Sequence, residues 1–218
     1  LRDERKAIGM FDQALELHRS SGDLRAQAIV LNNLMVSWNI LDRPRLATLY
    51  GKQAVNILQG LRGGIRTFDT DIQKSFLSTV DYAYRTLAEL LIKQHRYHEA
   101  ERVIRMLKDE EYFEFVNRDG SVVASLDDRV SFTASEKTAL DLSGSASRDL
   151  DTARKKIEKL EIERAIAPSD KRAAVSTSIT EANAELNKAS AVMQAAVAKV
   201  EAQLSLRIPP EPTGERGA

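Results

Sequence analysis

The chain has 218 residues, of which 43% are hydrophobic and only 6% aromatic, a composition that favours thin layers of packed helices over one deep core. Its 32 Lys and Arg residues equal its 32 Asp and Glu residues, so the net charge gives no reason to expect binding to nucleic acid or to an acidic membrane. It contains no cysteine, which excludes disulfides, thiolate metal sites and a cysteine nucleophile within these residues.

No apolar run approaches the roughly 20 residues needed to span a bilayer, and no signal peptide is visible. The chain begins with Leu1 and not with Met, inside a predicted helix, so we expect a truncated start. We therefore expect a cytoplasmic location without membrane contact, while a targeting signal upstream of Leu1 stays open.

The first helix carries the small-residue spacing of a tetratricopeptide repeat, a pair of helices that cross where side chains are small. The order Ala7, Phe11 and Ala14 is that of the second helix of such a pair. Residues 1–20 are therefore predicted to be half a repeat. Ser21-Gly22-Asp23 then predicts a turn and the start of the next helix.

A full helix pair is predicted over residues 24–60. Apolar residues recur at helical spacing in its first helix, up to Trp38. The place of Trp38 in the repeat favours packing between helices over stacking against a ligand. In the second helix, Ala47 and Ala54 repeat the small-residue spacing, and Gly51 stands at the aromatic position.

A second full pair is predicted over residues 72–116, because Leu87 and Ala100 repeat Leu34 and Ala47 at the same separation of 13 residues. Ala100 follows Ala47 by 53 residues, which exceeds the roughly 34 of a standard tetratricopeptide unit. The helices or their connecting loops are therefore longer than standard. Together, the half repeat and the two pairs form a predicted repeat domain over residues 1–119.

A connector is predicted over residues 120–146. Thr133 and Glu136 form a capping box that begins a short helix over residues 134–142, and Ser143-Gly144-Ser145 is predicted to end it.

A long helical hairpin is predicted over residues 147–206. The apolar seam of its second helix recurs in steps of four and three, as in a coiled coil: Val175, Ile179, Ala182, Leu186, Ala189, Met193, Ala196 and Val200. Pro168-Ser169-Asp170 predicts a short turn, and a short turn implies an antiparallel pair. Residues 207–218 are rich in proline and are predicted to be a linker to a missing downstream domain. The fold class is therefore all-α: a tetratricopeptide-like α-solenoid of antiparallel helix pairs, followed by a coiled-coil-like hairpin.

Four stretches of the repeat domain resemble bacterial CHAT proteins: LATLYGKQAVNILQGLR at 46–62, QKSF at 73–76, YRTLAELL at 84–91 and LKDEEYF at 107–113. Proteins of that family carry tetratricopeptide repeats before a C-terminal caspase-like peptidase domain, with a variable charged helical hairpin between them. The resemblance implies a peptidase domain downstream in the same chain. It does not make these residues a peptidase, because that domain needs a His and a Cys and no Cys is present.

Other chemical signals are weak. His95 and His98 have a spacing that can place two metal ligands on one helix face, but they lie at a predicted turn, which favours an ordinary surface turn. No zinc-protease motif, phosphate-binding glycine loop or nucleophile elbow is present. The basic residues of the hairpin alternate with acidic ones, which indicates a solvated face and not a nucleic-acid site. We expect no catalytic residue, no metal and no cofactor.

The first helices of tetratricopeptide pairs line a concave groove, and their outward positions are the best binding candidates. These positions are Asn32, Asn33, Val36 and Asn39 in one pair and Tyr82, Arg85, Glu89 and Lys93 in the other. Asn and basic side chains can hold a peptide backbone or a carboxylate. In chaperone-binding relatives an Asn stands at the position of Asn33, within a basic cluster that holds a C-terminal carboxylate. The other residues of that cluster are missing here, so capture of a C-terminal carboxylate is not expected. Simple solvation of these residues stays open.

The sequence therefore predicts a non-catalytic scaffold, the N-terminal part of a bacterial CHAT-type protease, which binds a protein or peptide in the repeat groove. Binding there is expected to change the packing of repeats and hairpin and so to gate the protease. The alternative is a structural module without a peptide ligand, which mediates self-association or supports the peptidase fold. Finding a specific metal or nucleotide bound to the purified protein would favour a third interpretation, an enzyme in its own right.

Overall fold

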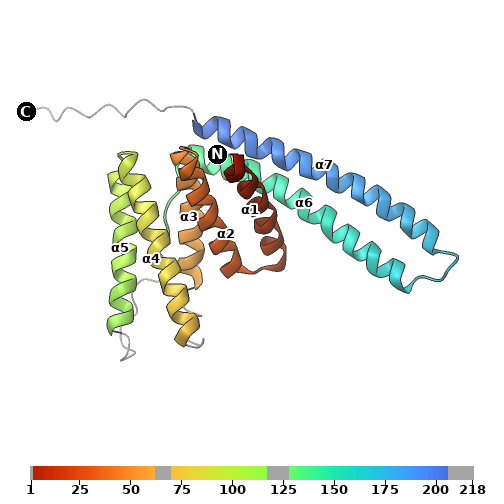
Figure 1. The fold of residues 1–218 in the computed structure, drawn as a ribbon, viewed down its shortest axis with the longest axis horizontal. Helices are drawn as coiled ribbons and strands as arrows, with labels where there is room; N and C mark the ends of the chain where they lie inside the picture. The colour runs from red at the N-terminus through yellow and green to blue at the C-terminus, as the bar shows by residue number, and fades with distance from the viewer. Residues whose placement is uncertain (1, 62–69, 117–127, 206–218) are drawn as a thin grey trace, which may run out of the picture. The chain divides into compact units, whose positions relative to one another are not determined.

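The protein is all-helical, as the sequence predicts. The computed structural model describes residues 2–61, 70–116 and 128–205, and these form helices joined by turns and one extended segment. The helices are α1 (Arg2–Ser21), α2 (Leu24–Ile40), α3 (Pro44–Leu61), α4 (Thr70–Lys93), α5 (Tyr97–Val116), α6 (Ala134–Ile166) and α7 (Arg172–Ser205). The chain divides into two compact units, Leu1–Ala134 and Ser135–Ala218 (Figure 1).

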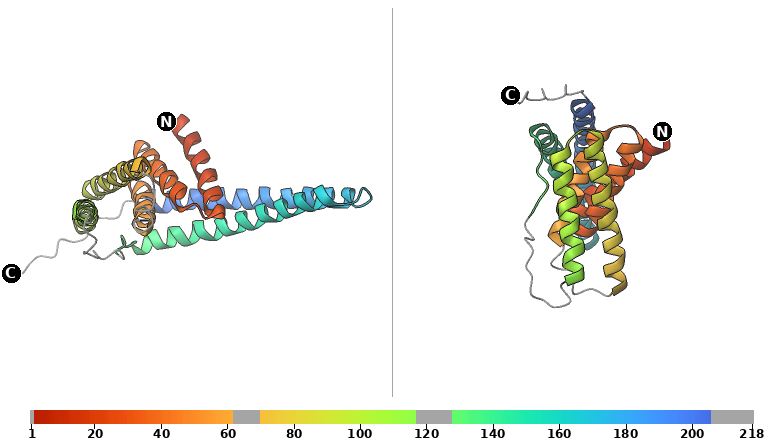
Figure 2. Two further views of the ribbon diagram at one scale, coloured as in Figure 1. Left: turned by 90° about the horizontal axis from the view of Figure 1, so that it is seen from below. Right: turned by 90° about the vertical axis from the view of Figure 1, so that its left-hand side faces the viewer.

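In the first unit, each of the helices α1 to α5 packs against its neighbour along the chain. The right-hand view of Figure 2 shows α4 and α5 lying alongside each other. The bounds of α1 to α5 lie within a few residues of the predicted half repeat and two helix pairs. The predicted linker at 207–218 lies outside the described residues.

The residues of the turn between α1 and α2 fix where α1 ends and where α2 begins. Gly22 has a φ of 72°, a left-handed conformation that glycine adopts without a steric penalty, and it closes α1. Asp23 then caps α2, because its side chain accepts a hydrogen bond of 3.0 Å from the backbone N–H of Ala26. The sequence Ser21-Gly22-Asp23 therefore makes the turn that it predicts.

The turns inside the two helix pairs have the same geometry. Asp42 after α2 and His95 after α4 both adopt a left-handed φ, 56° and 61°. The next residue in each turn donates its N–H back to the helix, Arg43 to the carbonyl of Trp38 and Arg96 to that of Leu91, at 2.9 Å in both. This is the Schellman arrangement that ends many helices. Its recurrence after 53 residues matches the separation of Ala47 and Ala100.

The core of the first unit depends on small residues of α3. Ala47 and Ala54 are fully buried, as Ala100 is in α5. A Cβ atom added at Gly51 would lie 2.5 Å from Sδ of Met35 in α2 and 3.1 Å from Cδ1 of Leu87 in α4. Both helices therefore approach α3 closely at Gly51. Trp38 is only 2% exposed, so it packs in the core and offers no stacking surface to a ligand.

In the second unit, α6 differs from its prediction. The helix is continuous from Ala134 to Ile166, so Ser143-Gly144-Ser145 does not end it, and the predicted short helix over 134–142 and the first hairpin helix are one. The Ser143 hydroxyl donates to carbonyls one turn earlier, at 3.1 Å, instead of breaking the helix. A single glycine costs a helix only about 1 kcal/mol, which the rest of a long helix outweighs.

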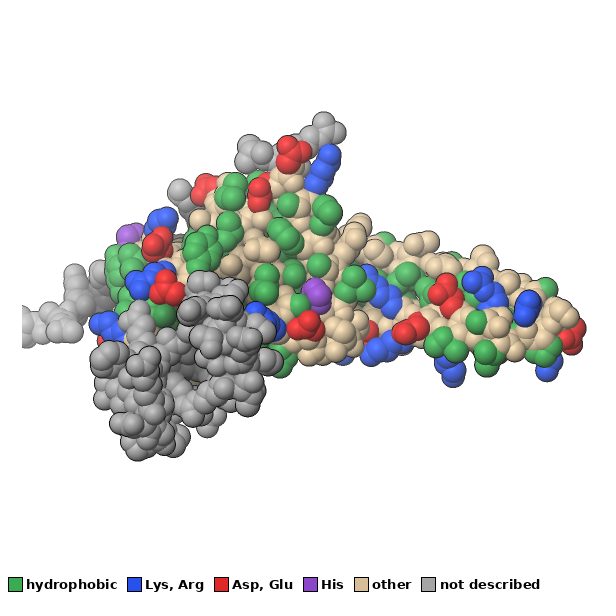
Figure 3. Space-filling view, turned by 60° about the horizontal axis from the view of Figure 1, so that its bottom comes forward, with side chains coloured by type: hydrophobic (Ala, Val, Ile, Leu, Met, Phe, Trp, Pro, Cys, Tyr) green, Lys and Arg blue, Asp and Glu red, His purple; other side chains and the backbone are tan. Residues whose placement is uncertain are grey.

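A turn after Ala167 joins α6 to α7, and the two helices run back alongside each other (Figures 1 and 2). Ala167, Val175 and Ile179 form an apolar cluster near this turn, with Leu160 packed against it. All eight predicted seam residues of α7 are buried or half-buried. Figure 3 shows charges of both signs intermixed along α6 and α7, and Lys156 pairs with Glu185 across the two helices at 2.8 Å.

Candidate functional site

The predicted groove residues of α2 do not all reach the surface. Asn33 and Val36 are half-buried and Asn39 is exposed. Asn32, predicted to point outward, is only 8% exposed, and its amide oxygen finds no hydrogen-bond partner among the residues that the structure describes. The reason is its helical position: Asn32 follows the buried Ala28 by four residues and precedes the buried Met35 by three, so it shares their side of α2.

The predicted groove residues of α4 are all exposed: Tyr82, Arg85, Glu89 and Lys93. Half of the Tyr82 surface is accessible. Arg85 donates to Asp81 one turn earlier at 2.7 Å, a solvent-exposed pair that orients the guanidinium along the helix. An aromatic side chain and charges of both signs therefore stand on one helix.

Three exposed isoleucines extend this surface and were not predicted from the sequence. Ile29 and Ile40 of α2 are 42% and 56% exposed, and Ile92 of α4 is 45% exposed. Helical spacing could have found them, because each lies three or four residues from a predicted groove residue on the same helix: Ile29 from Asn33, Ile40 from Val36 and Ile92 from Glu89. We call these three residues, with Asn33, Val36, Tyr82, Arg85 and Glu89, the first-helix surface.

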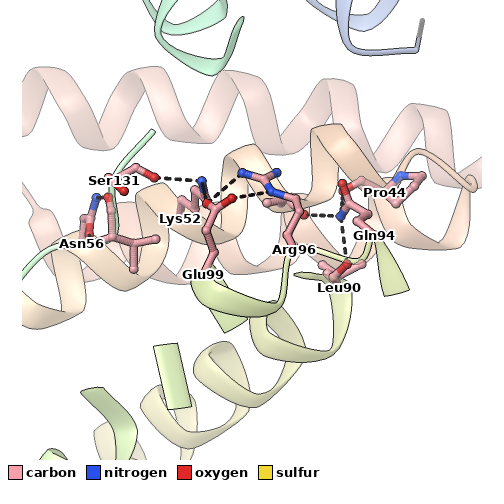
Figure 4. A network of polar contacts seen from close by, with 10 residues as sticks. Pro44, Lys52, Asn56, Leu90, Gln94, Arg96, Glu99 and Ser131 are labelled. Carbon is pink, nitrogen blue, oxygen red and sulfur yellow. Dashed lines mark hydrogen bonds and ion pairs between the residues drawn. The ribbon is translucent and has the colours of Figure 1, made fainter. Parts of the chain in front are cut away.

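A second polar site lies between α3, α5 and residues 128–132 (Figure 4). Its centre is Lys52 of α3, whose side chain is completely buried. The Lys52 ammonium donates to Glu99 of α5 at 2.5 Å and to the carbonyl of Ser131 at 2.8 Å. Arg96 donates to both carboxylate oxygens of Glu99, at 2.7 and 2.8 Å. The buried charge of Lys52 is thus compensated by one carboxylate that a second cation also holds.

The electrostatics of this site favour the ionised carboxylate. Burial works to raise the pKa of Glu99, but hydrogen bonds from Arg96 and Lys52 outweigh it and hold the pKa below the ordinary 4.5. Glu99 therefore stays charged at neutral pH and serves as a structural anchor between α3 and α5.

Residues 128–132 lie extended against α3 and form what we call the strap, Asp128–Phe132. The side-chain amide of Asn56 donates to the carbonyl of Val130 at 3.0 Å and accepts its N–H at 2.7 Å. Arg102 of α5 pairs with Asp128. The ammonium of Lys52 lies 5.9 Å from the ring centre of Phe132.

Gln94 fixes the end of α4 to the start of α3. Its side-chain nitrogen contacts the hydroxyl of Thr48 at 2.7 Å and the carbonyls of Leu90 and Pro44 at 2.9 and 3.2 Å (Figure 4). This contact and the Lys52 cluster both hold the second helix pair against the first.

An acidic cluster lies between α1 and α3. Glu16 is 4% exposed and accepts from Arg19 at 2.8 Å, and Arg19 also reaches Gln53 of α3 at 3.4 Å. Burial, together with the charge of Glu16, raises the pKa of Asp12 to about 7, and Arg19 opposes this shift. Burial, together with the charge of Asp12, also raises the pKa of Tyr50. The charge of Asp12 therefore changes near neutral pH.

Of the two histidines with metal-ligand spacing, His95 lies in the turn between α4 and α5 and His98 in the first turn of α5. His95 and His98 are exposed, and Nδ1 of His95 lies 2.7 Å from the hydroxyl of Tyr97. Within the described part of the chain, no group of three or more His, Asp or Glu side chains is arranged to hold a metal ion. In the same residues, no helix has both the length and the apolar character needed to cross a membrane.

Comparisons with known proteins give no support for a family: no family model matches the chain, and neither curated proteins nor solved structures give a significant match.

Lys52, Asn56 and the strap were not predicted from the sequence. The sequence did contain an indication of this site. Lys52 and Asn56 are four residues apart, so they share one face of α3 with the buried Thr48. A lysine on the buried face of an amphipathic helix needs a partner. The partner carbonyl of Ser131 is 79 residues away in the sequence, and nothing local indicates it.

Proposed function

We propose that this protein is a non-catalytic interaction scaffold that binds an extended peptide of another protein on the first-helix surface. The observation that carries the proposal is the exposed combination on α4: Tyr82 half exposed, the charged Arg85 and Glu89, and the 45% exposed Ile92. Aromatic and Arg side chains contribute most of the binding free energy at protein interfaces. Asn33 on α2 adds an amide that can pair with a peptide backbone.

The packing of α3 supports the participation of both helices. Met35 of α2 and Leu87 of α4 both approach Gly51, so the two helices flank the same point of α3. Their other faces carry the half-buried Asn33 and the exposed Arg85. A tetratricopeptide-like solenoid would use these faces as its concave groove.

Selection of peptides from a random display library against the full chain tests the proposal. We expect Asn33→Ala combined with Arg85→Ala to weaken the binding of the selected peptides at least about 10-fold, because each substitution removes a polar contact worth about 1 kcal/mol. Arg105→Ala is the matched control, since Arg105 also forms an exposed pair with a carboxylate one turn earlier, Glu101, at 3.0 Å on α5. Peptides that bind the double variant and the Arg105→Ala control equally well would place the binding surface elsewhere.

We further propose that the scaffold belongs to a CHAT-type protease and couples peptide binding to a peptidase domain in the same chain. The resemblance of residues 46–62 and 84–91 to that family supports this assignment. Its test is protease activity of the full-length protein with and without a selected peptide. Activity that is equal in both states, or absent altogether, contradicts the coupling.

A second candidate function is self-association. Met10 and Leu17 of α1 are seven residues apart on one helix face and are 70% and 55% exposed, and Leu24 at the start of α2 is 47% exposed. Light scattering over a range of concentrations distinguishes the candidates. A dimer that Met10→Gln with Leu17→Gln abolishes supports self-association, and a concentration-independent monomer rules it out.

A further inference from the structure

The strap Asp128–Phe132 is bound to the helices in the way that an extended peptide is bound by a receptor. It forms neither helix nor sheet, yet Val130 is only 3% exposed. Its contacts come from Asn56 of α3, 74 residues from Val130 in the sequence, and from Arg102 of α5, 26 residues from Asp128. Residues 117–127 connect it to α5 along the chain.

Two side chains of α3 bind the strap through its backbone. The Asn56 amide pairs with both the N–H and the C=O of Val130, so it takes the place of a neighbouring strand. Lys52 donates to the next carbonyl, that of Ser131. These contacts require an extended backbone and no particular side chain, which is how peptide-binding grooves obtain general affinity.

Three side chains of the strap, two positions apart, contact the groove, and Arg129 is also half-buried, with its guanidinium 3.6 Å from where a Cβ at Gly60 of α3 would lie. Asp128 pairs with Arg102, Val130 is buried, and Phe132 is half-buried beside the Lys52 ammonium. Ser131 between them is exposed. The groove therefore selects an acidic residue, a small branched residue and an aromatic residue at every second position.

The strap is held far less firmly than the helices. One buried side chain and a few polar contacts oppose the conformational entropy of five ordered residues, so its release costs much less free energy than unfolding α3 or α5. A vacated groove would leave the Asn56 amide and the buried Lys52 without their backbone partners. Another extended backbone supplies the same partners.

We propose that the groove between α3 and α5 is a second peptide-binding site, which the chain fills with its own strap and which an extended segment of a partner protein, carrying Asp-x-Val-x-Phe or a close equivalent, occupies by displacing it. The site is distinct from the first-helix surface. The strap acts as a tethered competitor whose effective concentration is of millimolar order.

A labelled peptide of residues 126–134, Leu-Asp-Asp-Arg-Val-Ser-Phe-Thr-Ala, tests this proposal by fluorescence anisotropy with the full chain. We expect the strap variant Val130→Asp to bind the peptide at least about 10-fold more tightly than the unsubstituted chain, because the competitor is weakened. Adding Asn56→Ala to that variant should abolish the gain. Ser131→Ala is the matched control, since only the backbone of Ser131 is used, and it should bind like the unsubstituted chain.

The opposite results overturn the proposal: equal binding by the Val130→Asp and unsubstituted chains, or binding that survives Asn56→Ala. A dimer that the peptide dissociates would assign the groove to the strap of a second copy and would also overturn the partner-peptide occupant. If circular dichroism shows that Val130→Asp unfolds the chain, hydrogen exchange of the unsubstituted chain decides. The Val130 amide should exchange at least about 100-fold faster than the core amides of α3, and equal protection overturns the proposal.

Discussion

Two carboxyl side chains in this protein show how charged neighbours decide the ionisation of a group that burial disfavours. Asp12 and Glu99 are both carboxyls near a helix contact, but their pKa values move in opposite directions. Glu99 receives hydrogen bonds from two cations, whereas Asp12 faces the carboxylate of Glu16 with Arg19 as its opposing charge. The partner, and not the residue type, therefore decides which carboxyl costs stability at neutral pH.

Asp12→Asn should stabilise the chain at pH 8 and have little effect at pH 4. The pKa of Asp12 is about 7 in the folded chain, against an ordinary value of 3.8 for an aspartate, so the folded state binds the proton more tightly than the unfolded state does. Asp12 therefore lowers the free energy of unfolding by nothing below pH 4, where it is protonated in both states. As the pH rises from there to about 7, its ionisation in the unfolded state increasingly destabilises the folded chain. We expect a gain of about 2 kcal/mol at pH 8 in urea unfolding. Asp149→Asn, at an exposed position of α6, is the control, and a loss of stability in Asp12→Asn at pH 8 contradicts the argument.

Lys52→Met should destabilise the chain by about 1–3 kcal/mol. The substitution leaves the Ser131 carbonyl without its donor and Glu99 with Arg96 alone, and breaking a buried pair is costly because it leaves a partly buried charge. Urea unfolding at pH 7 measures the change. Lys155→Met removes a pair between the exposed Lys155 and the half-buried Asp151 and should cost about 0–1 kcal/mol, so equal effects of the two substitutions would contradict a structural role for Lys52.

At the scale of the element, Gly51 of α3 and Gly144 of α6 have different roles. Gly51 allows α2 and α4 to approach α3, because a Cβ there would meet Met35 and Leu87. Gly144 has only Arg148 nearby, at 3.7 Å, which is an ordinary contact distance. The sequence predicts Gly51 inside a helix and Gly144 at the end of one, and the difference in their roles depends on which helices pack against them.

Gly144→Ala and Gly51→Ala should therefore have different effects. Alanine at Gly144 should stabilise α6 by about 0.5–1 kcal/mol, because it lowers the conformational entropy of the unfolded chain and improves helix propensity. At Gly51 the same gain is offset by the displacement of Met35 and Leu87, so we expect no stabilisation or a loss of about 1 kcal/mol. Thermal unfolding followed by circular dichroism compares the two. A Gly51→Ala variant as stabilised as Gly144→Ala would contradict the close-packing argument.

At the scale of the whole chain, local patterns predicted more of the fold than of the site. The helix pairs could be predicted because alanine spacing and the Ser21-Gly22-Asp23 turn act within a few residues. The continuity of α6 could not, because Gly144 and two serines are typical of a helix end and only length and packing outweigh them.

The candidate site was predicted in part for the same physical reason. Arg85 and Tyr82 reach the surface because helical periodicity places them there, whereas Asn32 turns inward. The strap could not be predicted, since the pairing of Asn56 with Val130 joins residues 74 positions apart and an extended segment has no periodic signature.

The arrangement of α1 to α5, each against its chain neighbours, predicts how a core substitution spreads. Leu34 of α2 is fully buried, and Leu34→Ala should cost about 3 kcal/mol through the cavity it leaves. If stability is a sum of neighbouring contacts, as in repeat proteins, the loss concentrates in the adjoining helices. Hydrogen exchange should then accelerate most in α1, α2 and α3 and least in α5. Leu87→Ala in α4 is the mirror control, with its largest effect in α3, α4 and α5. Equal acceleration of all five helices by both variants would instead mean that the unit unfolds as one cooperative block.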